Sequence, residues 1–493
     1  MLEVMLDLPS GALMQKTVWD TNSSNLFIDG EALVLNKGNL MQRDPSVIRE
    51  EILRYSVNEE GQKFFDKAVS KFVEANQQRL NEIELEAFDI IKQARAGREN
   101  HISMVSFSGG KDSTVASDLV RRAYANQSII HIFGDTTLEL PETQLYVKRF
   151  RAEHKKTPFL ESKSRHDFLD LCNQIGPPSR VMRWCCTVFK TGPISQTFEG
   201  LSKTKPILTY YGIRRSESNR RANYEAITES PKVSRQTVVS PIINWIDGDI
   251  WLYIFAHGLD FNDAYKLGFS RVGCWACPSN SMWSFHLTRV YQPELAEPWR
   301  NYLLEVAVTM GKPDPEEYVD SGNWKKRQGG QGLNTAYKGI VTSRPCGDDP
   351  DAKTYTLTKS ISEDLYEYFK PFGVVDLGRG RSLLGEVFVV DANTQDPIMV
   401  LQGRSGTNEL RVKIVNSNNP TLLMQRVDCQ VRKYQSCVLC SGCPAICPAG
   451  AISDKTGRYV INEDKCVHCL QCVSHYDTGC LVSKVLKTKK GSI

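Results

Sequence analysis

The spacing of the cysteines near the C-terminus constrains this 493-residue chain more than any other feature of its sequence. Eight of the fifteen cysteines lie there in two runs, and both runs begin with a cysteine at every third position. The first reads CVLCSGCPAIC, and the second reads CVHCLQC before a longer gap to a last cysteine. In a reducing compartment, clustered cysteines indicate metal binding or catalysis rather than disulfides. We therefore expect both runs to bind metal.

The first run, Cys-x-x-Cys-x-x-Cys-x-x-x-Cys-Pro, resembles that of the bacterial ferredoxins, in which the fourth cysteine binds the other of two clusters. The resemblance implies a ferredoxin-like α+β domain over residues 431–493 with two 4Fe–4S clusters. A zinc module is the alternative, and His468 and His475 are surplus to the thiolate count. The crossed pattern assigns Cys437, Cys440, Cys443 and Cys480 to one cluster and Cys447, Cys466, Cys469 and Cys472 to the other.

Composition and charge exclude several classes of protein. No run of about 18 apolar residues occurs, so we expect no membrane span. The N-terminus, MLEVMLDLPSGALMQKTVWD, has acidic residues and no sustained apolar segment, so we expect no secretory signal and a cytoplasmic location. The net charge of +4 is too small to indicate a nucleic-acid binder by itself, although an uneven distribution could still create a basic face.

Buried strands alternate with helices from residue 102 onward. ISMVSF (102–107) and SIIHIF (128–133) read as strands, and each precedes a helical stretch, at 111–125 and 140–154. KPILTYYG (205–212) reads as a further strand. This alternation predicts an α/β fold with a parallel sheet and crossover helices.

The loop SGGKDS (108–113) between the first strand and its helix combines the features of an anion site. Glycines let backbone N–H groups approach phosphate oxygens, and a helix N-terminus adds favourable partial charge. Ser108 and Ser113 can donate hydrogen bonds, and Lys111 supplies a positive charge. Neither GxxxxGK[ST] nor GxGxxG is present. From these residues alone, a phosphate site and an ordinary capped strand-to-helix turn both stay open.

SFSGGKDSTV resembles the PP-loop of the ATP pyrophosphatase superfamily, whose members hold nucleotide phosphates in an SGGxDS turn. Three later stretches are similar to the phosphoadenylyl-sulfate (PAPS) reductase branch, in the family's order: GDTTLELPETQLYV (134–147), YYGIRRSESNRR (210–221) and SPIINWIDGDIWLYI (240–254). The resemblance covers about residues 100 to 285. It implies a PP-loop sheet with flanking helices that binds ATP and Mg²⁺ and splits ATP to AMP and pyrophosphate.

The same resemblance implies the roles of individual residues. Asp135, at a strand end, would position Mg²⁺ or the ribose, and the arginines would bind phosphate or a nucleic-acid backbone. Lys111, Asp112 and Arg215 would be catalytic. The nucleotide-binding set is Ser106, Ser108, Gly109, Gly110, Lys111, Asp112, Ser113, Asp135, Gly212, Arg214 and Arg220.

Four further cysteines form two pairs, in RWCCTVFK and GCWACPS. Four thiolates could hold Zn²⁺ or a 4Fe–4S cluster, or they could be plain thiols. Cluster-bearing members of the PAPS reductase branch use a Cys-Cys pair followed by Cys-x-x-Cys, so the resemblance implies a third 4Fe–4S cluster. Its ligands would be Cys185, Cys186, Cys274 and Cys277. We expect the isolated Cys172, Cys346 and Cys429 to be buried structural thiols.

One departure from the PAPS reductase branch bears on function. Its assimilatory members carry a C-terminal Glu-Cys-Gly-x-His segment whose cysteine attacks the sulfate sulfur, and this sequence has no such segment. GCWACP is similar to the Gly-Cys-Trp-x-Cys stretch of the Dnd and Ssp types of DNA phosphorothioation protein. The resemblance then implies adenylation of a DNA backbone phosphate oxygen, which sulfur from a partner cysteine desulfurase replaces. A ferredoxin-coupled APS or PAPS reductase and a tRNA-thiolating enzyme are the alternatives.

These observations divide the chain into four predicted domains. An N-terminal β/helical extension covers 1–99, and the PP-loop domain covers 100–300. A helical linker and a small β-rich module cover 301–430, where EVFVVDANTQDPIMVLQ and ELRVKIVN are rich in β-branched residues. The ferredoxin-like domain follows.

Overall fold

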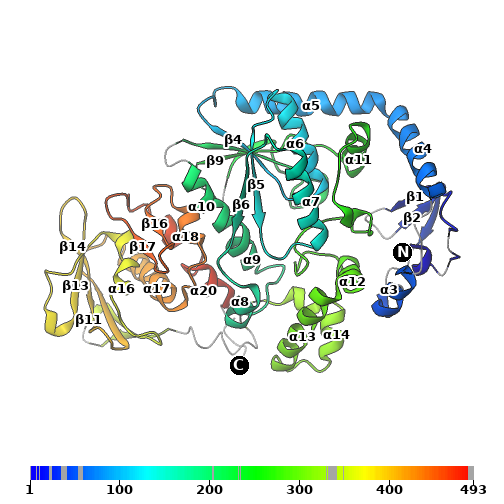
Figure 1. The fold of residues 1–493 in the computed structure, drawn as a ribbon. Coiled ribbons are helices and arrows are strands. Elements are labelled where there is room, and N and C mark those ends of the chain that lie inside the picture. The colour runs from blue at the N-terminus through cyan, green and yellow to red at the C-terminus, as the bar shows by residue number, and fades with distance from the viewer. Residues whose placement is uncertain are drawn as a thin grey trace. The chain divides into compact units, whose positions relative to one another are not determined.

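The computed structural model describes most of the chain (Figure 1). The described ranges are 2–6, 8–9, 11–20, 25–34, 41–53, 59–201, 205–230, 233, 235–328, 330, 341–347 and 349–486. They divide into two compact units: the first unit comprises 1–162, 205–230 and 236–302, and the second unit comprises 163–204, 231–235 and 303–493. Within the described ranges, no helix is both long and apolar enough to cross a membrane.

A six-stranded sheet with the order β6-β5-β4-β7-β9-β8 forms the core of the first unit. β4 pairs in parallel with β5 and β7, and β7 pairs in parallel with β9, whereas β8 is antiparallel to β9. This confirms the predicted α/β fold with a largely parallel sheet. The strands are β4 (Ile102–Ser106), β5 (Ile130–Asp135), β6 (Phe159–Lys163), β7 (Ile207–Tyr211), β8 (Ile227–Glu229) and β9 (Gln236–Val239).

Helices pack on this sheet through two apolar cores. Val105 and Leu208 of the sheet share one core with α5, α6 and α11. Phe107 and Phe133 share the other core with α7. The helices are α5 (Gln77–Arg95), α6 (Lys111–Ala123), α7 (Pro141–Glu153) and α11 (Asp247–Ala256).

Smaller elements complete the first unit. Three short strands near the N-terminus pair antiparallel. These elements are α1 (Leu2–Met5), β1 (Val18–Asp20), β2 (Asn25–Ile28), β3 (Glu31–Val34), α3 (Pro45–Leu53), α4 (Glu59–Ala75), η2 (Arg215–Glu217), η3 (Asp263–Tyr265), α12 (Met282–Tyr291) and α13 (Pro293–Thr309), whose last turns belong to the second unit.

The second unit contains an antiparallel six-stranded sheet, β10-β11-β15-β14-β13-β12. Its register places Thr354 opposite Arg411 and Val387 opposite Leu401. The predicted β-rich module is therefore present, and its inward residues pack against α17. The elements are β10 (Thr342–Cys346), β11 (Asp349–Thr356), β12 (Val374–Asp376), β13 (Glu386–Val390), β14 (Pro397–Gln402), β15 (Glu409–Ile414) and α17 (Pro420–Ser436).

Short helices and one small hairpin make up the rest of the second unit. β16 and β17 pair antiparallel, with Ile452 opposite Ile461. The elements are α8 (Phe168–Ile175), α9 (Trp184–Cys186), η1 (Thr187–Thr191), α10 (Gly192–Leu201), α14 (Pro315–Asp320), η4 (Asn323–Lys326), α16 (Asp364–Glu367), η5 (Lys370–Phe372), η6 (Ser382–Leu384), α18 (Gly442–Ile446), β16 (Ile452–Ser453), β17 (Val460–Ile461), α19 (Gln471–Ser474) and α20 (Leu481–Leu486).

Candidate functional site

The SGGKDS loop joins the end of β4 to the start of α6 in the first unit. Gly110 caps the helix in an extended conformation, with φ −97° and ψ 159°. Ser113 Oγ accepts hydrogen bonds from Ser108 N and Ser108 Oγ at 3.1 Å each, and it donates to the Gly110 carbonyl at 2.8 Å. Ser108 and Ser113 thus brace the loop, and the loop lies at a helix N-terminus, where partial positive charge favours anions.

Two residues outside the loop fix its position. A Cβ at Gly212 would lie 2.5 Å from the carbonyl carbon and oxygen of Asp112, so only glycine allows β7 to end so close to the loop. Asn262 Nδ2 donates to the Gly109 carbonyl at 2.9 Å. Gly212, which we predicted from the resemblance, is therefore in contact with the loop.

Two buried cations share two carboxylates beside the loop. The side chains of Lys111 and Arg214 are 4% and 5% exposed, whereas that of Asp247 is 47% exposed. Asp247 Oδ1 lies 3.1 Å from Lys111 Nζ and 3.0 Å from Arg214 Nη2, and Asp112 Oδ1 accepts from Arg214 Nε. Each buried cation therefore has a carboxylate partner, and the partner that faces solvent is Asp247.

A tyrosine that the sequence analysis missed closes the other side of the loop. Tyr265 Oη accepts a hydrogen bond from Lys111 N at 3.0 Å, and Lys111 Nζ donates to the Ser270 carbonyl at 3.4 Å. Burial, and then the Asp112 charge, raise the pKa of Tyr265, so its hydroxyl is neutral. Asp247 lies in a stretch that carried the resemblance, but nothing in the sequence distinguished Tyr265 or Asn262.

The remaining predicted residues have separate positions. Ser106 and Asp135 are buried at the ends of β4 and β5, and Asp135 Oδ1 accepts from Thr137 N at 2.8 Å. Arg215 Nε donates to the Tyr224 carbonyl at 2.8 Å, and Arg220 is exposed. The structure thus brings Lys111, Asp112 and Arg214 together, whereas the Arg215 guanidinium bonds elsewhere.

Asp135 lies near a second carboxylate. Burial raises the pKa of Glu139, hydrogen bonds from Thr136 oppose this shift, and the Asp135 charge adds to it. Thr136 Oγ1 lies 3.2 Å from Cys274 Sγ, so these carboxylates neighbour the Cys274–Cys277 turn. Mg²⁺ binds one or two carboxylates together with substrate phosphates, and Asp135 and Glu139 fit that ligand set.

The two cysteine pairs of the predicted third cluster fall in different units. Cys274 and Cys277 form a turn in the first unit, in which Cys277 N donates to the Cys274 carbonyl at 3.1 Å. Cys185 and Cys186 end α9 in the second unit. The assignment of all four to one cluster stays a prediction.

The isolated cysteines differ in burial. Cys172 is buried, as predicted, but Cys346 and Cys429 are only partly buried, so the prediction is wrong for these two. Cys346 ends the edge strand β10, where one side of the sheet is open. Cys429 lies on α17, and its Sγ is 3.9 Å from the Asp477 carbonyl.

The crossed pattern divides the eight C-terminal cysteines into two predicted groups, which we name group A (Cys437, Cys440, Cys443 and Cys480) and group B (Cys447, Cys466, Cys469 and Cys472). In group A, burial raises the pKa of Cys440, and the thiols of Cys480, Cys443 and Cys437 raise it further. Burial, Cys437 and Cys443 likewise raise the pKa of Cys480 to about 12. Cys480 therefore neighbours the first run, and its role as a cluster ligand with that run stays a prediction.

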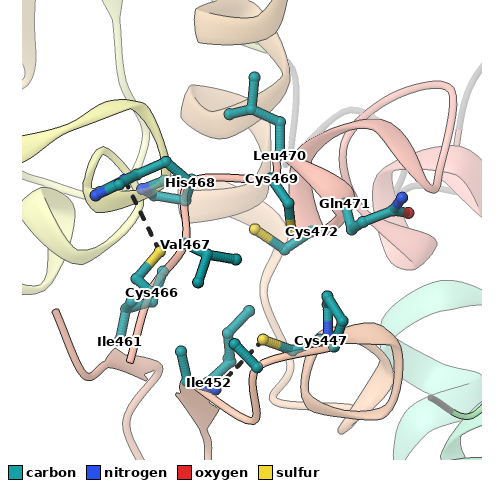
Figure 2. Close-up of a pocket in the computed structure, with 14 residues that line it drawn as sticks. Cys447, Ile452, Ile461, Cys466, Val467, His468, Cys469, Leu470, Gln471 and Cys472 are labelled. Atoms are coloured by element: carbon teal, nitrogen blue, oxygen red, sulfur yellow. Dashed lines mark hydrogen bonds between the residues drawn. The ribbon is translucent and has the colours of Figure 1, made fainter. Parts of the chain in front are cut away.

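Group B surrounds a cavity of about 330 Å³, including the part open to solvent (Figure 2). Burial raises the pKa of Cys466 most. A backbone hydrogen bond from His468 opposes this shift, and the thiols of Cys447 and Cys469 add to it. Ala451 N donates to Cys447 Sγ at 3.3 Å. Cys447 of the first run therefore neighbours the cysteines of the second run.

The two runs repeat the same backbone conformation. Leu439 and Ser441 have φ of 56° and 59°, and the equivalent His468 and Leu470 have φ of 49° and 59°. Left-handed conformations at residues other than glycine cost about 1–3 kcal/mol each and persist where the surroundings impose them. Each run therefore makes the same pair of left-handed turns, one on each side of its middle cysteine.

Groups A and B each offer four thiols, the number that a 4Fe–4S cluster requires. A zinc ion would need its sulfur ligands gathered about 2.3 Å from one point. In the part of the chain that the structure describes, no three or more His, Cys, Asp or Glu side chains form a group that could hold a metal ion. Whether 4Fe–4S clusters or zinc ions bind these thiols therefore stays a prediction.

A segment around Cys185 and Cys186 packs against group A within the second unit. Tyr476, whose pKa is raised by burial and by Cys440, Cys443 and Cys480, hydrogen-bonds Thr187 at the end of this pair. Gln196 Nε2 donates to Ser441 Oγ at 2.8 Å. The Cys-Cys pair and group A are therefore joined by packed side chains.

One comparison with known proteins covers the part of the chain that contains this site. Residues 102–280 match the family model of the phosphoadenosine phosphosulfate reductase domain. This match supports a domain of the PAPS reductase type in that part of the chain. It extends over the SGGKDS loop, Asp135 and Arg214, and it ends before the β-rich module and the C-terminal cysteines.

Three relatives are similar to this chain. Two uncharacterized proteins of Methanocaldococcus jannaschii are 29% and 30% identical to it, over 53% of this chain in each case. These alignments cover 61% and 54% of the relatives' own lengths. An adenosine 5'-phosphosulfate reductase of Staphylococcus epidermidis is 28% identical over 41% of this chain and 81% of that protein.

Proposed function

We propose that this chain is an ATP pyrophosphatase that adenylates an oxygen of a nucleic-acid backbone phosphate, so that sulfur can replace it. The observation that supports nucleotide chemistry most is the convergence of Lys111 and Arg214, both buried, on a glycine loop at a helix N-terminus. The proposal of DNA as acceptor rests on the GCWACP stretch and on the missing Glu-Cys-Gly-x-His segment.

In the proposed reaction, the acceptor oxygen attacks the α-phosphorus of ATP, the bond to the bridging oxygen breaks, and pyrophosphate leaves. Backbone N–H groups of the loop bind the phosphates, and Lys111 and Arg214 neutralise the charge that grows on the leaving group. Asp247 releases these cations as the phosphates bind. Asp135 and Glu139 would hold Mg²⁺, which supplies charge stabilisation when bound.

We also propose that groups A and B each hold a 4Fe–4S cluster, with a third on Cys185, Cys186, Cys274 and Cys277. Such a cluster supplies one-electron transfer when bound. The crossed grouping of the thiols and the repeated left-handed backbone support the first two. Sulfur would come from a partner cysteine desulfurase as a persulfide. Its terminal sulfur would displace AMP from the adenylated phosphate, and two electrons from an external reductant would then split the S–S bond that remains.

The test measures pyrophosphate release from ATP by the anaerobically purified full chain, with DNA and a cysteine desulfurase present. We expect Lys111→Ala to slow release by about 100- to 1,000-fold, by analogy with the loss of one transition-state donor. Lys155→Ala is the matched control, because Lys155 is exposed in the same unit. An unchanged rate in Lys111→Ala would contradict the proposal.

A second candidate is reduction of a sulfonucleotide, which the similarity to a protein named adenosine 5'-phosphosulfate reductase favours. The chain would then release sulfite from APS or PAPS in the presence of a reductant. Sulfite release without any ATP cleavage would select this candidate over the first.

A further inference from the structure

A buried lysine lies between groups A and B. Lys433, on α17, is 1% exposed, and its Nζ donates to the Cys472 carbonyl of group B at 2.6 Å. The thiol of Cys443 in group A interacts electrostatically with the same ammonium. One ammonium therefore lies beside both groups.

A lysine is charged at neutral pH, so Lys433 places a positive charge in the interior beside these groups. Within the described ranges, no carboxylate forms an ion pair with Lys433. A buried ammonium without a partner is costly, so this one depends on the negative charge of the groups on either side.

Two stacked tyrosines, Tyr368 and Tyr459, lie next to Lys433. The rings of Tyr368 and Tyr459 lie 4.6 Å apart at 13°, and Lys433 Nζ lies 5.5 Å from the Tyr459 ring. Tyr368 hydrogen-bonds the Cys437 thiol of group A. Among the described residues, the buried Tyr459 hydroxyl has no hydrogen-bond partner, and its neighbours include the thiols of Cys443 and Cys472.

We infer that Lys433, with Tyr459 and Tyr368, forms a polar wedge between the two groups that raises the reduction potential of both centres. The inference rests on the proposed clusters. Reduction adds one negative charge to a centre, and a buried cation beside it stabilises that charge with little screening by solvent. Because Lys433 lies beside both groups, it also weakens the repulsion between two reduced centres.

The experiment is a redox titration of the anaerobically purified full chain, followed by electron paramagnetic resonance. In Lys433→Met, which keeps the length and the apolar stem, we expect the equilibrium constant for one-electron reduction of both C-terminal centres to fall at least tenfold, which is 59 mV for a one-electron couple. Lys455→Met is the matched control, because Lys455 belongs to the same unit and its side chain is 54% exposed. Its potentials should stay at the wild-type values.

Tyr459→Phe provides a second test if Lys433→Met does not fold, because it removes only the unpartnered hydroxyl, and it should lower the potentials by a smaller amount. Wild-type reduction potentials in iron-loaded Lys433→Met would overturn the inference. A shift of the potentials in Lys455→Met equal to that in Lys433→Met would overturn it as well. Where only Tyr459→Phe folds, wild-type potentials in that variant would overturn it. A wild-type chain without iron and labile sulfide after reconstitution would instead overturn the proposed clusters, and the wedge with them.

Discussion

Replacing Asp247 with asparagine should tighten nucleotide binding. Asp247 Oδ1 lies 3.1 Å from Lys111 Nζ and 3.0 Å from Arg214 Nη2, so a bound phosphate competes with this carboxylate for both cations. The Asp247 side chain is 47% exposed, so solvent screens the two ion pairs. Each is then worth about 0.5 kcal/mol. Removing both should lower the Kd for ATP about fivefold, which corresponds to about 1 kcal/mol.

Isothermal titration calorimetry of the full chain with ATP, without an acceptor, measures this change. Asp260→Asn is the matched control, because Asp260 pairs with Arg149 at 3.0 Å and its side chain is 36% exposed. Without nucleotide, Asp247→Asn should also unfold at a lower temperature than the wild type, because two buried cations lose a counter-charge. An unchanged or higher Kd in Asp247→Asn would refute the reasoning, since the carboxylate would then not compete with phosphate.

Three further predictions each concern one residue. Gly212→Ala should weaken ATP binding at least tenfold in the same titration, because the added Cβ would lie 2.5 Å from the Asp112 backbone. Gly200→Ala is the control and should bind ATP normally, because a Cβ there has nothing within 4 Å. Equal affinities of the two variants for ATP would contradict the packing argument. Cys440→Ala should lose the iron and sulfide of one cluster in a colorimetric assay, whereas Cys346→Ala should keep the wild-type content, and full content in Cys440→Ala would contradict group A. Burial lowers the pKa of His131 to about 4. As the pH falls, His131 therefore takes up its proton in the unfolded chain before it does so in the folded chain. The free energy of unfolding should therefore fall by up to about 1.4 kcal/mol per pH unit as the pH drops from about 6.5 to 4, and equal losses in the wild type and His131→Gln would contradict this assignment.

The first unit was largely predictable from its sequence. Apolar runs such as ISMVSF are bounded by a glycine loop and a helix, and α6 begins at Lys111 as the pattern predicts. Local hydrophobic pattern and turn residues determine such elements. The crossed ligation by Cys447 and Cys480 comes from the resemblance alone and stays a prediction.

The contacts that complete each site were not predictable, because they join residues distant in sequence. Tyr265 meets Lys111 N across 154 positions, and Lys433 meets Cys472 across 39. Asp247 is the first residue of α11 and looks like an ordinary first-turn carboxylate until the fold places it beside two cations. Lys433 sits in an amphipathic helix, where a lysine normally faces solvent.

A structure of the full chain bound to ATP tests the central claim most directly. We predict that the phosphates lie against residues 108–113 and that Lys111 Nζ leaves Asp247 for a phosphate oxygen. A nucleotide bound elsewhere, or a Lys111–Asp247 ion pair that persists beside bound ATP, would contradict the account.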